Sequence, residues 1–466
     1  MARLLWILAA GCLLSLRPAP ADGWKPLFNG RDLTGWHILN GTATYAVAEG
    51  AIVGTSVTGS PNTFLATTAR YDDFVLELEV WVDPALNSGI QIRSESRPDY
   101  QNGRVHGYQV EIDPSSRAWS GGIYDEARRG WLYPLDINPT GRRAFVTGQW
   151  NTYRIECIGS SVRTWVNGLP CADLVDTVSR AGFIALQVHS IDDPALAGKQ
   201  IRWRNIRIRT ENLTPSPWTD IRVVNLVPNT LSPQEKAQGW ILLFDGKTTD
   251  GWRGAHKSAF PAKGWAVTDG ILRVQPSTGA ESQNGGDIVT LDTFSRFEFQ
   301  AECMLKPGAN SGIKYFVTEQ YPTTGSAIGL EFQLLDDALH PDAKLGAAGN
   351  RTIGSLYDLI PAHTGKSVNP PGSWNHVRLV VAGTLRGESP AGNQTASFQL
   401  PGAYVEHWLN HRQVLRYTRG DQAFDALVAR SKYAGYEGFG RWPSGRILLQ
   451  DHGDEVMFRS IKVRRL

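Results

Sequence analysis

Residues 447–453 read I-L-L-Q-D-H-G, and residues 184–190 read I-A-L-Q-V-H-S. In an extended chain every second side chain points to the same face, so Gln187 and His189 lie opposite Leu186. Each phrase therefore predicts a β-strand with one apolar face in a core and a second face that carries Gln and His. Because the phrase occurs twice, it predicts that one scaffold occurs twice.

Other strands alternate in the same way. On each strand an apolar set of side chains faces a largely polar set: Tyr108, Val110 and Ile112 against Gln109, Glu111 and Asp113, and Leu330, Phe332 and Leu334 against Glu331, Gln333 and Leu335. The chain has 48 Gly and 16 Trp and few stretches at helical spacing, which favours short strands and turns. We expect an all-β fold of antiparallel sandwiches whose polar faces are open or lightly covered.

Most of the chain is repeated once in tandem. G-W-K-P-L-F-N-G-R-D-L-T-G-W at 23–36 matches G-W-I-L-L-F-D-G-K-T-T-D-G-W at 239–252. Further pairs follow in the same order: N-S-G-I at 87 and 310, G-Y-Q-V-E at 107 and G-L-E-F-Q at 329, I-Y-D at 123 and L-Y-D at 356, and W-R-N-I-R-I-R at 203 and F-R-S-I-K-V-R at 458. A period of about 200 residues is too long for a solenoid and indicates two copies of one domain.

A short linker joins the two copies. We expect the first copy at 22–212, the linker at 213–238 and the second copy at 239–466. Within the linker, L-S-P-Q-E-K-A-Q-G predicts a short helix with Ser232 as N-cap, Pro in the first turn and Gly239 as its end.

The two copies differ in their loops. The second copy has extra residues at about 335–352, within 382–404 and within 416–446, whereas the first copy has a longer loop at 131–145. Loops that differ on a shared scaffold usually tune the choice of ligand.

The N-terminal residues predict export. Arg3 precedes an apolar run, and Ala-Pro-Ala at 19–21 forms a small-x-small cleavage site, so we expect a signal peptide at 1–21 and a secreted or periplasmic protein in a bacterium. A weak lipoprotein box ends at Cys12, and lipidation is the less favoured alternative. No later stretch is long and apolar enough to predict a membrane span.

Charge and cysteine content exclude several classes of partner. The net charge is +2 with 20% charged residues scattered along the chain, which does not predict nucleic-acid binding. Cys157 and Cys171 fall on predicted strands that a third strand separates, beyond disulfide reach, so we expect free buried thiols there and at Cys303. The cysteines form no metal-binding pattern, and the sequence sets no oligomeric state.

The polar faces of the second copy gather long functional side chains. Glu331 and Gln333 share a face, as do Gln450 and His452, and Lys314 follows N-S-G-I. A solvated outer face is the simpler interpretation of any one of these strands. If the strands lie in one concave sheet, however, their side chains converge on a cleft.

Three other features remain open at this stage. Asn310 and its counterpart Asn87 belong either to a turn or to the cleft. Four tryptophans are expected in the core or on the rim, where a ring could stack on a sugar: Trp36, Trp150, Trp252 and Trp374. His340 lies among Asp336, Asp337 and Asp342, whose ligand types would suit a cation although their spacing matches no strong metal signature.

The repeated openings, N-S-G-I, L-Y-D and L-L-Q-D-H-G resemble the 3-keto-disaccharide hydrolase domain family, once per copy and over about 85% of the chain. The resemblance implies a concanavalin A-like jelly roll, a secreted bacterial setting, and cleavage of glycosides oxidised at C3. The second copy is the closer match. The first copy exchanges Glu and Gln at 109 and 111, has Val188 in place of Asp, and lacks the H-P-D-A-K loop, which leaves its activity open.

A C3 ketone acidifies the proton on C2, so proton removal, elimination at C1 and hydration would cleave such a glycoside. For this chemistry we expect a small-molecule carbohydrate substrate and three catalytic residues, His452, Glu331 and Asp336. Substrate-binding residues are expected at Asn310, Lys314, Gln333, His340, Tyr357, Trp374 and Gln450. Their expected first-copy counterparts are Asn87, Arg93, Glu111, Tyr124, Gln187 and His189. No cofactor is firmly implied, and a divalent cation stays an alternative.

Two other functions compete with this interpretation. Laminarinase-type glycosidases use a strand motif E-x-D-x-x-E, which Glu111 and Asp113 begin, but Ser116 occupies the third acidic position. A lectin-like binding protein would also use a sandwich with a polar concave face, because fold does not settle function.

Overall fold

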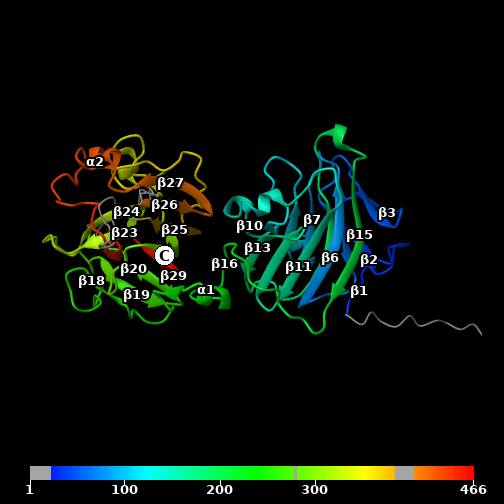
Figure 1. Ribbon diagram of the computed structural model, residues 1–466, viewed down its shortest axis with the longest axis horizontal. Helices are drawn as coiled ribbons and strands as arrows, with labels where there is room; N and C mark the ends of the chain where they lie inside the picture. The colour runs from blue at the N-terminus through cyan, green and yellow to red at the C-terminus, as the bar shows by residue number, and fades with distance from the viewer. Residues whose placement is uncertain (1–22, 278–280, 384–402) are drawn as a thin grey trace, which may run out of the picture. The chain divides into compact units, whose positions relative to one another are not determined.

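The computed structural model describes residues 23–277, 281–383 and 403–466. The expected signal peptide, Cys12 and most of the extra segment at 382–404 lie outside the described residues. The described chain forms two compact units (Figure 1). The first extends to Ile221, and the second comprises the residues from Arg222 onward together with the short segment Val175–Thr177. Within these residues no helix has the length and apolar character needed to cross a membrane.

The first unit is a sandwich of two sheets. One sheet has the order β13 (Leu169–Val175), β12 (Ser161–Val166), β11 (Asn151–Ile158), β6 (Phe74–Val82), β15 (Gln200–Arg209), β4 (Ala51–Thr55) and β3 (Thr44–Ala48), with β1 (Lys25–Pro26) beside β15. The other has the order β10 (Gly130–Tyr133), β9 (Ile123–Glu126), β8 (His106–Ile112), β7 (Ser88–Glu95), β14 (Phe183–Val188), β5 (Thr63–Thr67) and β2 (Trp36–Asn40). Pairing is antiparallel, as in β6 with β11 and β7 with β8.

The second unit repeats this arrangement. Its back sheet has the order β19 (Trp265–Thr268), β20 (Ile271–Val274), β29 (Val456–Arg465), β22 (Phe297–Leu305), β25 (Trp374–Ala382), β26 (Tyr404–Leu409) and β27 (Arg412–Thr418), with β17 (Ile241–Leu242) beside β29. Its front sheet has the order β18 (Trp252–Gly254), β21 (Ile288–Thr290), β28 (Arg446–Leu449), β23 (Asn310–Thr318) and β24 (Ile328–Leu335). The core lies between the sheets, where Phe299 and Cys303 of β22 share a cluster with Phe332 of β24. The predicted pair of jelly-roll sandwiches is confirmed.

The alternation along the strands is confirmed, but the polar faces are not open. Leu330 and Phe332 are fully buried in the core, and Glu331 and Gln333 lie on the opposite face. These polar side chains are themselves only 5% and 1% exposed, because loops cover the front sheet. The expectation of an open or lightly covered face was therefore wrong, because the polar face is itself buried.

The cysteine prediction is confirmed. Cys157 lies on β11 and Cys171 on β13, with β12 between them, and both thiols are free and buried, as is Cys303. Burial raises the pKa of each thiol to about 12, so the thiols stay protonated and unreactive at neutral pH.

The repeated opening phrase closes each sandwich by the same contact. The indole Nε1 of Trp36 donates to the carbonyl of Leu27 at 2.9 Å, and that of Trp252 donates to the carbonyl of Leu243 at 2.5 Å. Both rings are buried. The tryptophans of the opening phrase therefore pack locally, as the core interpretation expected.

The loop differences carry small elements. In the first copy, η1 (Leu135–Ile137) and η2 (Gly141–Arg143) lie in the longer loop, and η3 (Pro194–Leu196) precedes β15. In the second copy, η4 (Pro341–Lys344) and α2 (Gln422–Val428) lie in the extra segments.

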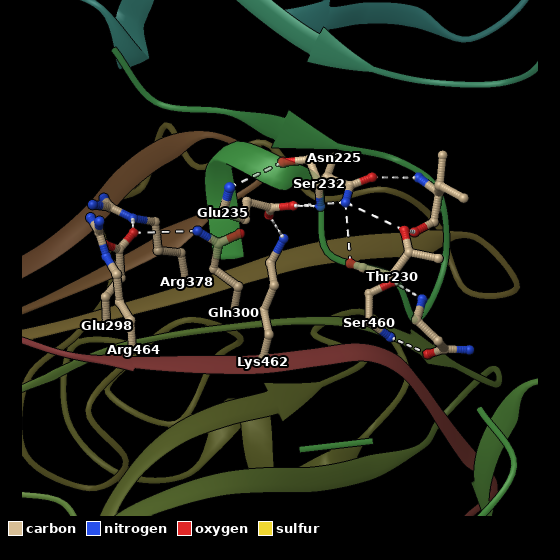
Figure 2. A network of polar contacts seen from close by, with 12 residues as sticks. Asn225, Thr230, Ser232, Glu235, Glu298, Gln300, Arg378, Ser460, Lys462 and Arg464 are labelled. Atoms are coloured by element: carbon tan, nitrogen blue, oxygen red, sulfur yellow. Dashed lines mark hydrogen bonds and ion pairs between the residues drawn. The ribbon is translucent and has the colours of Figure 1, made fainter. Parts of the chain in front are cut away.

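The linker helix packs on the back sheet of the second unit. After β16 (Val224–Asn225), α1 spans Pro233–Ala237 with Ser232 as N-cap, and Glu235 completes a capping box. Figure 2 shows that the Glu235 carboxylate also binds the Lys462 ammonium group of β29, at 2.5 Å, while both side chains are at most 5% exposed. Burial lowers the pKa of Lys462, and Glu235 opposes this shift.

We predict that Glu235→Ala destabilises the second unit by about 3 kcal/mol, because it leaves the Lys462 ammonium group buried without a carboxylate. Urea unfolding of the full chain measures this change. Lys236→Ala, on the exposed side of the same helix, is the control and should shift stability little. The double change Glu235→Leu with Lys462→Met should recover most of the loss, and a wild-type midpoint for Glu235→Ala would contradict the role given to the pair.

Candidate active site

Strands β23 and β24 of the front sheet and the loops around them enclose a cavity of about 440 Å³ in the second unit. Its wall includes seven of the ten side chains predicted for this copy: Asn310, Lys314, Glu331, Gln333, Tyr357, Gln450 and His452. They come from β23, from β24, from the end of β28 and from the loop after β24. Strand pairing explains the convergence, since Lys314 is the register partner of Glu331 and β28 pairs with β23.

Glu331 is a buried carboxyl group with an unusual proton affinity. A Cβ atom on Gly312 would overlap its Oε1, so the glycine of N-S-G-I makes room for the carboxyl group. Burial raises the pKa of Glu331 to about 7, although the charges of Lys314 and Lys432 work against that shift. Glu331 can therefore release and accept a proton near neutral pH.

Lys314 supplies a positive charge beside this group. Its Nζ lies 3.6 Å from the Asp287 carboxylate and donates to Ser326 Oγ at 3.2 Å. Burial by itself would lower the pKa of Lys314, but Asp287, Glu331 and Glu281 outweigh it and raise the pKa. The lysine therefore stays charged although its side chain is buried.

Two amide oxygens in the cavity wall accept no hydrogen bond within the described chain, those of Gln333 and Gln450. Their nitrogens are engaged, since Gln333 donates to Asn310 Oδ1 at 3.3 Å and Gln450 donates to Glu281 Oε1 at 3.0 Å. A buried acceptor without a donor is costly, so these oxygens suit a ligand that carries hydroxyl groups.

Asp451, the middle residue of Q-D-H, stabilises a turn. Asp451 is fully buried, and its Oδ2 accepts from the backbone N–H groups of Gly285 and Gly286, both at 3.0 Å. Its Oδ1 accepts from Gly453 N–H, also at 3.0 Å. The carboxylate thus holds the turn that precedes Asp287, while the residues on either side of it, Gln450 and His452, line the cavity.

His452 lies in the cavity wall next to a second histidine. The ring of His340, from the extra loop, meets the ring of His452 edge to face at 6.1 Å. Partial burial lowers the pKa of His340, and a charge on His452 would lower it further. His340 therefore reaches the site through His452 and is not among the side chains that enclose the cavity.

Tyr357 is held from the same extra loop. Its hydroxyl donates to Asp342 Oδ2 at 2.9 Å, and burial raises its pKa, with Asp342 adding to the shift. The Lys432 ammonium group, which also lines the cavity, lies 4.4 Å from the centre of the Tyr357 ring.

Two further predicted residues, besides His340, are not brought to the cavity. The Asp336 carboxylate accepts from the backbone N–H groups of Gly308 at 2.8 Å and Ala338 at 3.0 Å, so it caps a turn. Trp374 begins β25, which belongs to the back sheet, and its ring is covered by the Arg459 guanidinium group at 4.1 Å. Geometry thus gives Asp336 no contact with a substrate in this cavity, and it places Trp374 on the other sheet.

The acidic residues of the extra loop diverge. Asp337 pairs with Lys366 at 2.8 Å and Asp342 with Arg351 at 2.7 Å, so each carboxylate has its own cation. Across the described ranges, no group of three or more His, Cys, Asp or Glu side chains is arranged to hold a metal ion.

Sequence reasoning missed four polar residues of this site. Asp287 and Ser326 hold Lys314, Glu281 receives Gln450, and Lys432 faces Tyr357. Asp287 begins D-I-V-T at 287–290, which corresponds to F-L-A-T at 64–67 in the first copy. Both segments pair with the strand that leads into Gln-x-His, so this correspondence could have placed Asp287 near the predicted site. The other three come from loops, where the repeat offers no template.

In the first copy the register corrects one counterpart. Gln91 pairs with Gln109 as Lys314 pairs with Glu331, so Gln91 and not Arg93 corresponds to Lys314. Arg93 has a left-handed backbone, with a φ of 46°, at the irregularity near the end of β7, and its fully buried side chain donates to the Asp73 carboxylate at 2.9 Å. It lies away from the polar face.

The remaining first-copy counterparts lie around a chain of amide groups. Asn87 donates to Glu111 Oε1 at 2.8 Å, and Gln187 donates to Gln109 Oε1 at 2.9 Å. The Tyr124 ring meets that of Trp131 at 5.2 Å, and His189 Nδ1 lies 2.7 Å from the carbonyl oxygen of Ser190.

In the first copy, the two carboxylates that begin the laminarinase-type motif pair with one arginine. Arg117 binds both acidic residues, Glu111 at 2.8 Å and Asp113 at 2.7 Å. Glu111 therefore meets Arg117, Asn87 and Gln109 rather than an open cleft.

Comparison with known proteins gives a consistent result. The model of a family described as 3-keto-alpha-glucoside-1,2-lyase-like domain matches residues 23–209 and 239–464. A 3-keto-disaccharide hydrolase of Bacteroides thetaiotaomicron is 34% identical over 256 residues, which cover 49% of this chain and 79% of that protein.

Solved structures are similar over single copies. A putative glycosyl hydrolase of Parabacteroides distasonis shares 28% identity, with a TM-score of 0.41, over 51% of this chain and 99% of that one. The carbohydrate-binding module CBM66 of Bacillus subtilis shares 16% identity, with a TM-score of 0.28, over 38% of this chain and 96% of that one.

We predict that Asp451→Val destabilises the second unit by about 3 kcal/mol, because three buried N–H groups lose their acceptor. Chemical unfolding of the full chain measures the loss. Asp451→Asn retains one acceptor oxygen and should cost less. Equal stability of the Val variant and the wild type would show that the turn at Gly285 does not depend on this carboxylate.

Proposed function

The chain belongs to the family of 3-keto-α-glucoside-1,2-lyase-like domains, once in each copy, and from this membership we propose that its second copy cleaves the glycosidic bond of sugars oxidised to a ketone at C3. The observation that carries the proposal is the buried Glu331 carboxyl group, whose pKa of about 7 suits a base at neutral pH, next to the charged Lys314.

The first step is removal of the C2 proton. Glu331 takes the proton, and the electron pair of the C2–H bond moves towards the C3 ketone to form an enolate. The positive charge of Lys314 stabilises the developing negative charge, an effect that is strong where water is scarce. A buried carboxyl group with an ordinary pKa would be a weaker base than this one.

The second step breaks the bond at C1. The enolate electrons form the C1–C2 double bond as the C1–O bond breaks, and the leaving oxygen takes a proton from His452. Water then adds: its hydroxyl group bonds to C1, its remaining proton goes to His452, and Glu331 returns its proton to C2, so that a free 3-keto sugar and an alcohol result. The net reaction is hydrolysis, and each proton taken by Glu331 is returned.

Substrate binding is assigned to the amide groups. The unpaired oxygens of Gln333 and Gln450 would accept from sugar hydroxyl groups, and Asn310 orients Gln333 through its side-chain oxygen. Tyr357, the counterpart of Tyr124, and Lys432, from an extra segment of the second copy, would also contact the sugar. We also propose that the protein is exported through residues 1–21.

Replacing the base tests the proposal. Glu331→Gln in the full chain should lower kcat for a 3-keto glucoside by about 10²–10⁴-fold, because an amide cannot take the C2 proton. Release of 3-keto glucose measures turnover. Glu455→Gln, a carboxyl group of the same unit that pairs with Arg273 outside the cavity, is the matched control and should leave turnover unchanged. Wild-type activity in the Glu331 variant would refute the assignment.

The pH dependence should follow the same group. Because the pKa of Glu331 is raised to about 7, the carboxylate forms only as the pH rises through that value, so kcat/KM should increase about tenfold per pH unit below it and level off above it. The residual activity of Lys314→Met should show this limb at higher pH, since the cation that favours the carboxylate is gone. A limb near pH 4.5 that the Lys314 change does not move would contradict the prediction.

A further inference from the structure

The first copy lacks the ionisable groups at the centre of the second copy's site. Strand registers align Gln91 with Lys314 and Gln109 with Glu331. The pairing of β14 with β5 and of β28 with β21 aligns Phe64 with Asp287. Two carboxyl groups and one ammonium group are thus replaced by two amides and a phenyl ring. None of the three replacements can move a proton at neutral pH.

The amides bind one another instead. Gln109 Oε1 accepts from Gln91 at 2.8 Å and from Gln187 at 2.9 Å, and its nitrogen donates to Glu111 Oε2 at 2.9 Å. Glu111 is the one carboxyl group in this network. It also accepts from Asn87 and Arg117, so proton transfer would require it to give up these donors. The layer is therefore a support and not a set of reacting groups.

A cavity of about 570 Å³ lies beside this layer in the first copy. Its wall includes Asn40, Asn62, Phe64, Arg104, Glu126 and Ser190. Equivalent loops line the cavities of the two copies. The loop between β7 and β8 contributes Gln101 and Asn102 in the first copy, and the matching loop between β23 and β24 contributes Thr323 and Thr324 in the second. The scaffold thus keeps a cleft in both copies, displaced towards Phe64 in the first.

The charges in this cavity cancel. Glu126, only 6% exposed, accepts from the exposed Arg104 at 3.3 Å. Asn62 accepts from the backbone N–H of Ser190 at 2.9 Å, and its NH₂ group makes no hydrogen bond to the described residues. Phe64 lines the wall but is only 1% exposed, because its ring packs with Val105 and Phe183. Amide donors and a compensated carboxylate together suit a neutral ligand with many hydroxyl groups.

A larger hollow of about 880 Å³ on the first copy does not support a ligand site. Its charged side chains pair with one another, as Glu77 does with Arg154 and Arg207, both at 2.6 Å. The Trp165 ring at its edge already has the Arg163 guanidinium group 4.8 Å from its centre. Little of its polar surface is left for a ligand.

We propose that the first copy is a non-catalytic saccharide-binding module, which holds a neutral sugar in the cavity formed by Asn62, Phe64 and Glu126 while the second copy performs the chemistry. Only the identity of the ligand as a sugar rests on the function proposed above. The loss of the three ionisable groups that correspond to Asp287, Lys314 and Glu331 stands on the strand registers and on the hydrogen bonds of the amide layer.

Calorimetry on the full chain tests the binding. The background variant carries Gln333→Ala and Gln450→Ala, which remove the amide groups of the second copy's cavity. Titration with cellobiose, maltose and trehalose should give one site per chain for at least one sugar, with a Kd of roughly 1 mM. Adding Asn62→Ala with Glu126→Gln should weaken binding at least tenfold. Thr152→Ala, in the larger hollow, is the matched control and should not change the affinity.

Asn102→Gly keeps the test decisive if the Glu126 variant does not fold. Asn102 is exposed on the cavity wall with a left-handed φ of 56°, which glycine adopts without strain, so the loss of its side chain should weaken binding at least threefold with little change in the melting temperature. The proposal is overturned if none of the three sugars binds, or if binding survives every change at this cavity.

A turnover assay tests whether the first copy is non-catalytic. Full chain carrying Glu331→Gln should release no 3-keto glucose above about 1% of the wild-type rate. If it keeps about half, the first copy is catalytic and the inference is wrong. If the wild-type chain itself does not cleave 3-keto glucosides, the proposed function fails, whereas the calorimetric result still decides whether the first copy binds a sugar.

Discussion

The site of the second copy depends on keeping an ammonium group and two carboxyl groups together while all three side chains are buried. Removing such charges from water costs several kcal/mol per ion unless each finds a partner. Lys314 is the centre of this arrangement, with Asp287 and Ser326 on one side and Glu331 in register with it on the next strand. The proton affinity of Glu331 follows from this balance, because burial raises it and the lysine limits the rise.

A comparison of the two copies distinguishes the contacts that maintain the sandwich from those that are specific to one site. On the back sheets the same pairs recur: Arg204 with Glu79 in the first copy, at 2.7 Å, and Arg459 with Glu302 in the second, at 2.9 Å. The serine of N-S-G-I also recurs, binding the carbonyl of Gln187 in the first copy and of Gln450 in the second. The charged centre of the front sheet does not recur. The repeated contacts therefore maintain the sandwich, and the unrepeated ones distinguish the tasks of the two copies.

Alternation along the strands predicted the sandwich and placed Glu331, Gln333, Gln450 and His452 on one face, since a period of two needs only local sequence. Three predicted site residues lie elsewhere in the structure, because their positions depend on features that a period of two does not describe. Arg93 follows an irregularity that shifts the phase, Trp374 alternates equally well in either sheet, and the turn that Asp336 caps is formed by residues distant in the chain. The burial of the polar face depends on loops, for which the pattern gives no rule.

The linker helix shows that the unit that was duplicated and the unit that folds are not the same. The repeated phrase begins at Gly239, yet the compact second unit begins at Arg222, and the carboxylate that neutralises buried Lys462 lies on α1, before the phrase. The first copy has Arg207 at the position of Lys462, and its partner is Glu77 of its own sheet. A second copy cut at the start of the repeated phrase would therefore leave the Lys462 ammonium group buried without the carboxylate that neutralises it.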